Sequence, residues 1–369
     1  MNPPEKALKL PRILIAASIY PPDPGGPATH AKRQFEGFTE AGFEVRLVAL
    51  AHYRRYPMGI RHGLYLFKLF AESQYVDIVY AHDALGVGLP ALIVSKFMGK
   101  KMMARVGGDI PWEREAESRK TDLSMNEWYR TGLHIKNVSF LVSRFVLRKV
   151  DALVVPSQLL ADLYATYYGV RKNIISVIAN PISNISKDTT ATQSSTIIFA
   201  SRLVAYKNLP FVLTSLVKIF PKHAGLQFVI MGDGPEKTHL EQLARKLDIE
   251  SQVLFTGSIP QEKVVEYTKI CLLGVAPALT EFNPNYILEC IAYGKPFLMS
   301  RENGLPFQVP ESLLFDTRNS KEFEEKLESL LDPEQYAKAK LEIANIHFQM
   351  SWSDVVKKNI ELIKSIANQ

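Results

Sequence analysis

Short apolar runs alternate with longer amphipathic stretches along the first half of the chain. Apolar runs of four to eight residues are typical of buried strands, whereas apolar residues repeated every three or four positions are typical of helices. Such alternation indicates a parallel sheet with helices on both faces. The expected strands are residues 12–19, 44–50, 78–81, 101–106 and 152–155, and the expected helices are residues 29–41, 64–72, 85–97 and 135–149.

The alternation begins again after residues 182–196, a polar stretch without apolar periodicity that indicates an interdomain linker. The pattern therefore predicts an α/β protein of two Rossmann-like, doubly wound domains. Two facing sheets of this kind are expected to share one site in the cleft beyond the carboxyl ends of their strands. The expected strands are residues 197–201, 227–231, 253–256, 272–276 and 296–300, and the expected helices are residues 210–219, 237–247, 261–267, 285–293, 321–331, 334–346 and 351–367.

The composition is that of a globular protein, with 47% hydrophobic and 22% charged residues. Cys271 and Cys290 are too few for a disulfide framework or a cysteine-rich zinc site, so a reducing compartment fits best. No uncharged apolar run reaches the ~18 residues that a membrane-spanning helix needs. The run at residues 13–20 resembles a weak signal peptide, but we interpret it as the first buried strand.

Positive charge is concentrated in the first half of the chain. The net charge is +6, and residues 1–185 hold 24 Lys and Arg against 16 Asp and Glu. This asymmetry suits an anionic membrane surface, an acidic substrate or nucleic acid, and equally an ordinary solvated surface. The chain contains no recognised nucleic-acid-binding motif, so we expect no nucleic-acid partner.

Glu281 and Glu289 are the strongest local feature. Pro284 lies between them and favours the first turn of a helix, which places Glu281 in the preceding loop and Glu289 about one turn into the helix. The free N–H groups of such a helix start bind phosphate well, so one carboxylate would reach a substrate hydroxyl and the other a nearby sugar. The alternative is a helix start with two solvated glutamates.

Arg202 and Lys207 follow a predicted strand closely. Two cations at the carboxyl end of a strand suit a pyrophosphate and can neutralise charge on a phosphate leaving group. The alternative is a pair of surface cations. The turn Gly232-Asp-Gly234-Pro allows close backbone approach to a ligand, although it is also an ordinary tight turn.

Three features follow predicted strands in the first half. Gly25 and Gly26 lie in a Pro-rich loop and let backbone N–H groups approach a ligand. His82 and Asp109 follow two further strands; the alternatives are a core histidine and a turn-capping aspartate. No His/Cys/Asp cluster has metal-ligand spacing, and no Gly-x-Ser-x-Gly motif indicates a hydrolase.

In this order, these features resemble the retaining glycosyltransferases of the two-domain GT-B architecture, specifically glycosyltransferase family 4 (glycosyl transferases group 1). The resemblance covers nearly the whole chain. The shared motifs are Gly25-Gly26, residues 77–82, Gly108-Asp109 with Trp112-Glu113, residues 155–157, residues 179–181, Arg202-Leu203 with Lys207-Asn208, residues 232–235, residues 255–257, the Glu281…Glu289 pair and residues 294–296.

The resemblance implies an acceptor-binding domain at residues 1–185, completed by a C-terminal helix at 351–369, and a nucleotide-sugar-binding domain at 196–350. Arg202 and Lys207 would hold the donor pyrophosphate. Implied catalytic residues are Glu281, Asp109 and His82. Implied donor-binding residues are Gly25, Gly26, Arg202, Lys207, Gly232, Ile259, Asn283, Pro284, Asn285, Tyr286 and Glu289. The family is generally metal-independent, so neither a metal nor a cofactor is expected.

Two loops depart from the family pattern. Many relatives carry a histidine where this chain has Val106, which puts a sugar-contacting histidine in doubt. The loop after Glu281 reads Phe-Asn-Pro-Asn where Gly-Phe-Gly is commoner, and this bears on sugar specificity.

The implied function is transfer of a hexose-type sugar from a UDP- or GDP-sugar to a glycan or lipid-linked acceptor in cell-envelope polysaccharide or glycolipid synthesis. The alternatives are a nucleotide-sugar epimerase of the same architecture and a non-catalytic sugar-binding module. Product analysis separates transfer from epimerisation. The joint presence of Glu281, Glu289, Arg202 and Lys207 argues against a decayed site.

The stretch at residues 53–70 is both basic and aromatic. Its apolar residues suit a bilayer interface while its cations face anionic lipid. The alternative is a helix that packs on its own sheet with exposed cations. We therefore expect a cytoplasmic protein, with peripheral association at the inner face of an anionic membrane as an option.

Overall fold

The computed structural model describes residues 10–23, 25–182 and 194–368, and the chain forms two compact units. Unit 1 contains residues 1–111, 133–179 and 352–369, and unit 2 contains residues 112–132 and 180–351. Most of the linker expected at residues 182–196 lies outside the described residues. Residues 112–132 belong to unit 2, although the sequence analysis placed them in the first domain.

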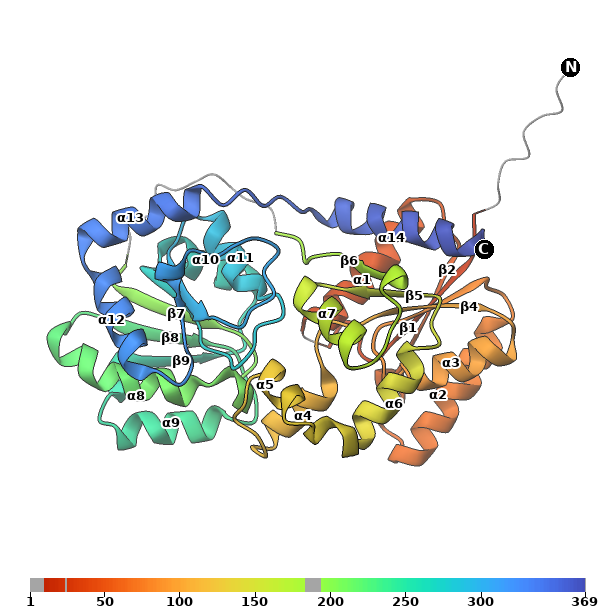
Figure 1. Cartoon of the computed structure of the whole chain (residues 1–369), viewed down its shortest axis with the longest axis horizontal. Coiled ribbons are helices and arrows are strands. Elements are labelled where there is room, and N and C mark those ends of the chain that lie inside the picture. The colour runs from red at the N-terminus through yellow and green to blue at the C-terminus, as the bar shows by residue number, and fades with distance from the viewer. Residues whose placement is uncertain (1–9, 24, 183–193, 369) are drawn as a thin grey trace, which may run out of the picture. The chain divides into compact units, whose positions relative to one another are not determined.

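Unit 1 is built on a parallel six-stranded sheet in the order β2-β1-β3-β4-β5-β6 (Figure 1). Its central strands are continuous apolar runs because helices cover both faces, and every residue of β1 and β3 is buried. The strands are β1 (Ile13–Ala17), β2 (Val45–Ala49), β3 (Ile78–Ala81), β4 (Lys101–Arg105), β5 (Ala152–Val155) and β6 (Ile175–Val177).

All but the last of the helices of unit 1 connect successive strands of this sheet. The helices are α1 (Gly26–Glu40), α2 (Met58–Ser73), α3 (Gly88–Phe97), α6 (Val138–Leu147), α7 (Gln158–Thr166) and α14 (Trp352–Ala367). The C-terminal α14 packs against α1. Asn359 of α14 accepts a hydrogen bond of 2.7 Å from the buried hydroxyl of Tyr80 in β3. This contact fixes the last helix to the first sheet.

Unit 2 is built on a second parallel six-stranded sheet, in the order β12-β11-β10-β7-β8-β9. The strands are β7 (Thr196–Ala200), β8 (Gln227–Met231), β9 (Val253–Gly257), β10 (Leu273–Ala276), β11 (Phe297–Ser300) and β12 (Leu314–Phe315). The helices are α4 (Ile110–Glu117), which runs into the unit from Ile110, α5 (Met125–Arg130), α8 (Leu209–Ile219), α9 (Lys237–Lys246), α10 (Gln261–Ile270), α11 (Asn285–Ala292), α12 (Ser320–Leu331) and α13 (Pro333–Ala344).

These two sheets confirm the predicted fold class, and several boundaries differ from the prediction. The helix expected at residues 135–149 begins at Val138, because Asn137 caps it by accepting a hydrogen bond of 3.0 Å from the N–H of Phe140. The helix expected at 64–72 begins earlier, at Met58. The short elements α4, α5, α7, β6 and β12 were not predicted.

Candidate functional site

The central feature of unit 2 is a buried ion pair at the carboxyl edge of its sheet. Lys207 follows β7 and Glu281 follows β10, and these two strands are neighbours in the sheet. The Nζ atom of Lys207 lies 2.8 and 2.9 Å from the two carboxylate oxygens of Glu281. Only 12% of the Lys207 side chain and 4% of the Glu281 side chain are exposed. Each charge therefore depends on the other for compensation.

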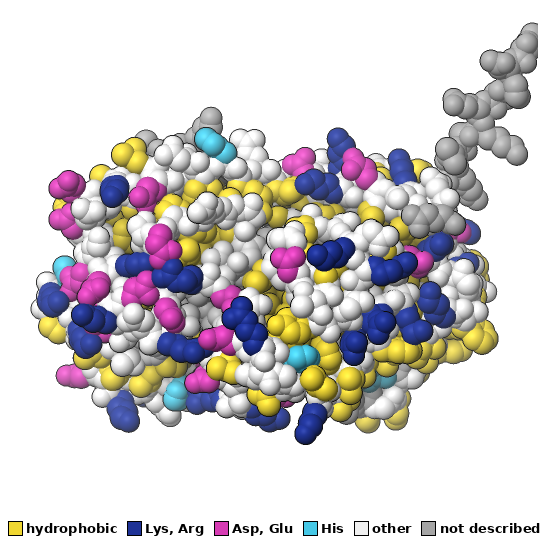
Figure 2. Space-filling model, viewed as in Figure 1, with side chains coloured by type: hydrophobic (Ala, Val, Ile, Leu, Met, Phe, Trp, Pro, Cys, Tyr) yellow, Lys and Arg dark blue, Asp and Glu magenta, His cyan; other side chains and the backbone are white. Residues whose placement is uncertain are grey.

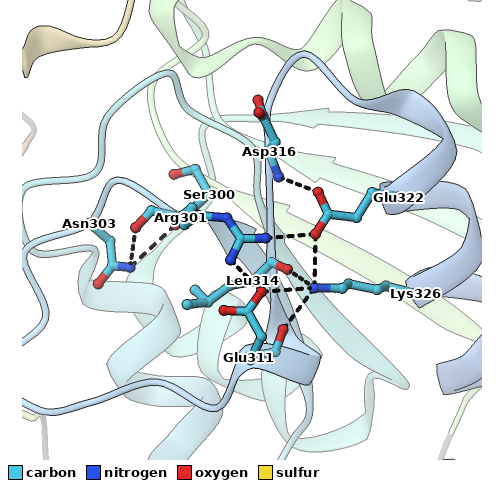
Figure 3. A network of polar contacts seen from close by, with 8 residues as sticks. All are labelled: Ser300, Arg301, Asn303, Glu311, Leu314, Asp316, Glu322 and Lys326. Atoms are coloured by element: carbon cyan, nitrogen blue, oxygen red, sulfur yellow. Dashed lines mark hydrogen bonds and ion pairs between the residues drawn. The ribbon is translucent and has the colours of Figure 1, made fainter. Parts of the chain in front are cut away.

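Backbone hydrogen bonds hold Glu281 from both sides. Its N–H donates to the carbonyl of Glu302 at 3.0 Å, and its carbonyl accepts from the N–H of Gly304 at 2.7 Å. The loop that makes these bonds continues from β11 and is anchored by the polar network in Figure 3. In that network Arg301 pairs with Glu322 at 2.7 Å and also with Glu311. The backbone of Glu281 is therefore fixed to the loop that follows β11.

Glu289 lies on α11 with its side chain buried. Burial raises the pKa of the Glu289 carboxyl to about 7. One oxygen, Oε1, accepts a hydrogen bond of 2.6 Å from Nε2 of Gln261. The other oxygen, Oε2, has no hydrogen-bond partner in the described part of the chain. A buried carboxylate oxygen with spare accepting capacity suits a ligand that donates hydroxyl groups.

The start of α11 presents several polar groups. Pro284 precedes the helix in an extended conformation, so the first-turn N–H groups have no intrahelical acceptor. The side-chain amide of Asn180 donates to Oδ1 of Asn285 at 2.8 Å and to the carbonyl of Asn283 at 3.3 Å. Tyr286 is buried, and its hydroxyl lacks a hydrogen-bond partner among the described residues. This helix start can therefore receive an anion or a hydroxyl-rich group.

Arg202 and the glycine turn lie at the ends of β7 and β8, which are also neighbours. The guanidinium of Arg202 is 65% exposed and donates to a carboxylate oxygen of Glu117 at 2.7 Å. Gly232 has φ +143°, and a Cβ added there would lie 2.0 Å from the carbonyl oxygen of Ser201. Only glycine allows these two strand ends to approach so closely. Ile259 packs nearby against a small core cluster of unit 2.

The candidates in unit 1 lie in the segments that follow β1, β3 and β4. Gly25 has φ +116° and precedes α1, whose first residue is Gly26. Asp109 is fully buried and accepts a hydrogen bond from the hydroxyl of Tyr168. Burial, with a smaller contribution from Arg105, lowers the pKa of His82 to about 3. The imidazole of His82 is therefore neutral at pH 7.

The structure brings Lys207, Glu281 and Glu289 to strand ends and a helix start of one unit, and it places His82 and Asp109 in the other. Sequence reasoning missed Gln261, Glu302 and Glu117, which contact the candidates directly. Gln261 lies 28 residues from Glu289, Glu302 lies 21 residues from Glu281, and Glu117 lies 85 residues from Arg202. No local sequence spacing indicates a contact between residues so far apart in the chain.

The described residues contain no group of three or more His, Cys, Asp or Glu side chains arranged to hold a metal ion. Within the same residues, every helix is too short or too polar to span a bilayer.

The family comparisons match nearly the same span as the motifs. The model described as Glycosyltransferase Family 4 matches residues 24–184, and the model described as Glycosyl transferases group 1 matches residues 182–344.

Two curated relatives and one solved structure illustrate the similarity. The gpi3 subunit of phosphatidylinositol N-acetylglucosaminyltransferase from Schizosaccharomyces pombe is 21% identical, over 96% of this chain and 81% of its own. N-acetyl-alpha-D-glucosaminyl L-malate synthase from Bacillus anthracis is 25% identical, over 64% of this chain and 59% of its own. The crystal structure of Anabaena Alr3699/HepE in complex with UDP and glucose superposes with a TM-score of 0.66 at 16% identity, over 97% of this chain and 98% of that one.

The two matched models run in chain order through both parallel sheets, and the solved structure shares the two-domain fold. This chain therefore belongs to the group 1 and family 4 glycosyltransferases of GT-B architecture, and it is a glycosyltransferase.

Proposed function

We propose that this protein is a retaining, metal-independent transferase that moves a hexose from a UDP-sugar, or failing that a GDP-sugar, to a glycan or lipid-linked acceptor. The observation that carries the proposal is the Lys207–Glu281 ion pair at the same sheet edge as the partly unpartnered carboxylate of Glu289. Residues 196–350 bind the donor, and residues 1–185 with α14 bind the acceptor.

Each donor-binding role follows from the chemistry of a side chain. Arg202 and Lys207 supply positive charge for the two phosphates, and the N–H groups at the start of α11 add donors beside them. The carboxylate of Glu289 accepts hydrogen bonds from the ribose hydroxyls. Glu281 lies against Lys207 at 2.8 Å and contacts the sugar near its reacting carbon. Gly232 and Ile259 line the nucleotide.

The reaction exchanges one bond at the sugar's anomeric carbon for another. The bond from that carbon to the phosphate oxygen breaks, and a bond to the acceptor oxygen forms on the same face. The acceptor's proton passes to the departing phosphate oxygen, so no separate base is required. Lys207 and Arg202 stabilise the negative charge that develops on the diphosphate. Asp109 and His82 orient the acceptor.

Two relatives support a hexose-type donor, because both are named for N-acetylglucosamine transfer, and the solved complex with UDP and glucose favours UDP. The relatives' names include one lipid acceptor and one small acid. A surface of unit 1 favours a lipid-linked acceptor for this protein.

This surface, which we call the helical face, consists of α2, α3 and α6. Helix α3 contacts both α2 and α6, and the rings of Phe70 and Phe97 lie 5.5 Å apart. Hydrophobic side chains and Lys and Arg lie together over these helices in Figure 2. Its exposed large apolar residues are Ile60, Leu64, Phe67, Phe70, Ile93, Phe97, Val138, Leu141 and Phe145. Exposed cations beside them are Lys68, Lys96, Arg148 and Lys149.

The two components suit the interface of an anionic bilayer, where apolar rings enter the acyl boundary and cations meet lipid phosphates. Phe67 and Phe97 are 73% and 77% exposed, which is unusual for phenylalanines on two adjacent helices of a soluble surface. We therefore place the enzyme at the inner face of a membrane, with the acceptor delivered from the lipid phase.

The donor claim is tested by incubating purified protein with UDP-glucose, UDP-N-acetylglucosamine, UDP-galactose and GDP-mannose, together with vesicles carrying a phosphoprenyl-linked sugar. Diphosphate release and proton NMR of the product are read together. The proposal expects release from one donor and a product with the donor's α-anomeric configuration. An inverted product contradicts retention. A free epimerised nucleotide sugar indicates the epimerase alternative, and sugar binding without turnover indicates a non-catalytic module.

The membrane claim is tested by flotation with vesicles of phosphatidylcholine alone or mixed with phosphatidylglycerol. The protein should float only with the anionic vesicles, and Phe67→Asp/Phe97→Asp should reduce the bound fraction several-fold. Leu341→Asp is the matched control, because Leu341 is 69% exposed on α13 of unit 2. Equal binding by all three proteins would contradict the assignment of the helical face.

A further inference from the structure

The chain between β4 and β5 makes an excursion into unit 2. Residues up to Pro111 and from Leu133 belong to unit 1, whereas residues 112–132 belong to unit 2. We call residues 112–132 the crossing segment; it holds most of α4 and all of α5. The segment starts three residues after Asp109, a candidate acceptor-side residue. It therefore ties a strand end of unit 1 to unit 2 through the covalent chain.

Trp112, the first residue of the crossing segment, packs against one chain neighbour of Lys207 and one chain neighbour of Glu281. Its ring centroid lies 5.4 Å from that of Tyr206, which precedes Lys207. It lies 5.9 Å from that of Phe282, which follows Glu281, and the two rings are perpendicular. Trp112 is fully buried, and its indole N–H donates to the carbonyl of Leu123 at 3.0 Å. The indole is therefore fixed in place between the two site loops.

The crossing segment also forms a hydrogen bond with Thr280, the residue that precedes Glu281. The N–H of Met125 donates to the hydroxyl of Thr280 at 2.9 Å, and that hydroxyl donates to Glu302 at 2.7 Å. The same Glu302 carboxylate accepts from the hydroxyl of Ser124 at 2.8 Å and from the N–H of Asn126 at 3.0 Å. Both chain neighbours of Glu281 and the residue before Lys207 thus contact the crossing segment.

We propose that Trp112 is a positioning residue that sets the geometry of the Lys207–Glu281 pair, so that the crossing segment forms part of the donor-site machinery. This inference rests on the proposed function. Packed aromatic contacts have few alternative arrangements, so a smaller side chain at position 112 lets the two loops shift. A misplacement of about 1 Å at a reacting centre costs up to ~100-fold in rate, with less effect on ground-state binding.

The experiment compares Trp112→Phe and Trp112→Leu with Trp128→Phe in the full-length protein. Trp128 is the matched control, because it is an equally buried tryptophan of the same segment whose ring packs on Tyr129. UDP affinity is measured by calorimetry, and kcat and KM are measured with the UDP-sugar that turns over. We expect Trp112→Leu to lower kcat at least ~30-fold with UDP affinity changed less than ~3-fold. Trp112→Phe should lose much less kcat than Trp112→Leu does, and Trp128→Phe should keep kcat within ~3-fold of the wild-type value.

A double-mutant cycle with Phe282→Leu separates positioning from general destabilisation. If Trp112 acts through Phe282, the double variant should lose little more kcat than the worse single variant. Multiplicative losses, or a loss of kcat in Trp112→Leu no larger than that in Trp128→Phe, would overturn the inference while the wild type still turns over. A wild type that binds neither UDP nor GDP and releases neither from any nucleotide sugar would overturn the proposed function, and this inference with it.

Discussion

Glu289→Gln should make the protein more stable at alkaline pH and a poorer nucleotide binder. Burial raises the pKa of the Glu289 carboxyl from 4.5 to about 7. The folded protein therefore holds this proton more tightly than the unfolded chain does. Between pH 4.5 and 7 the free energy of unfolding falls as pH rises, because the unfolded chain releases this proton while the folded protein still holds it.

The size of the effect follows from the shift. At about 1.4 kcal/mol per pKa unit, ionising Glu289 costs the folded state up to ~3 kcal/mol above pH 7. Glutamine is uncharged and close in shape, and it can still accept the hydrogen bond from Gln261. The variant avoids the cost, so its advantage should be near zero at pH 4.5 and approach ~3 kcal/mol at pH 8.5. At about 2–4 °C per kcal/mol, the difference in Tm should reach several degrees.

The assay is thermal unfolding of both proteins at half-unit steps from pH 4.5 to pH 8.5, without and with UDP. The ligand-free difference in Tm should grow with pH, and the gain on adding UDP should be smaller in the variant at pH 8, because the amide nitrogen accepts no hydrogen bond from a ribose hydroxyl. A ligand-free difference that does not change with pH, or a variant less stable than wild type at pH 8, would refute the reasoning.

Three further changes test other parts of the account. Lys207→Met leaves the buried carboxylate of Glu281 uncompensated and should lower the free energy of unfolding by about 3–5 kcal/mol, while adding Glu281→Gln should recover most of it in denaturant titrations. Gly232→Ala places a Cβ against the carbonyl of Ser201 and should cost more than ~1 kcal/mol and weaken UDP binding by calorimetry. Tyr168→Phe removes a donor from the buried carboxylate of Asp109 and should cost about 1–3 kcal/mol in the same titrations, whereas unchanged stability would show that this bond contributes nothing.

Parallel strands were the elements most accurately predicted from the sequence. The expected strands 78–81, 152–155 and 227–231 match β3, β5 and β8 residue for residue. Strands buried on both faces are continuous apolar runs with polar residues at their ends, so their limits are visible locally. The first residues of the helices were predicted less accurately. The capping box of α5, Ser124 with Glu127, is a readable signal that the prediction did not use.

The candidate site was predicted as a set of residue types, and its contacts were beyond the sequence. Spacing placed Glu281 before the helix and Glu289 within it, as the structure has them. It held no information on the Lys207–Glu281 ion pair or on the burial that raises the pKa of Glu289. The assignment of Trp112 to unit 2 is likewise decided by partners ~90–170 positions away, Tyr206 and Phe282. Such contacts depend on how the sheets fold, which no local pattern records.

The measurement that tests the central claim most directly is nucleotide binding by calorimetry and thermal shift, with UDP, GDP, ADP and NAD as ligands. Arg202→Ala and Glu289→Ala are compared with Arg245→Ala, a control at an exposed arginine on α9 of the same unit. The account predicts that UDP stabilises the wild type and the control, by about 2.7 kcal/mol at 100 times its Kd, and that both site variants lose this stabilisation. Stabilisation by none of the four ligands, or by UDP equally in all four proteins, would contradict it.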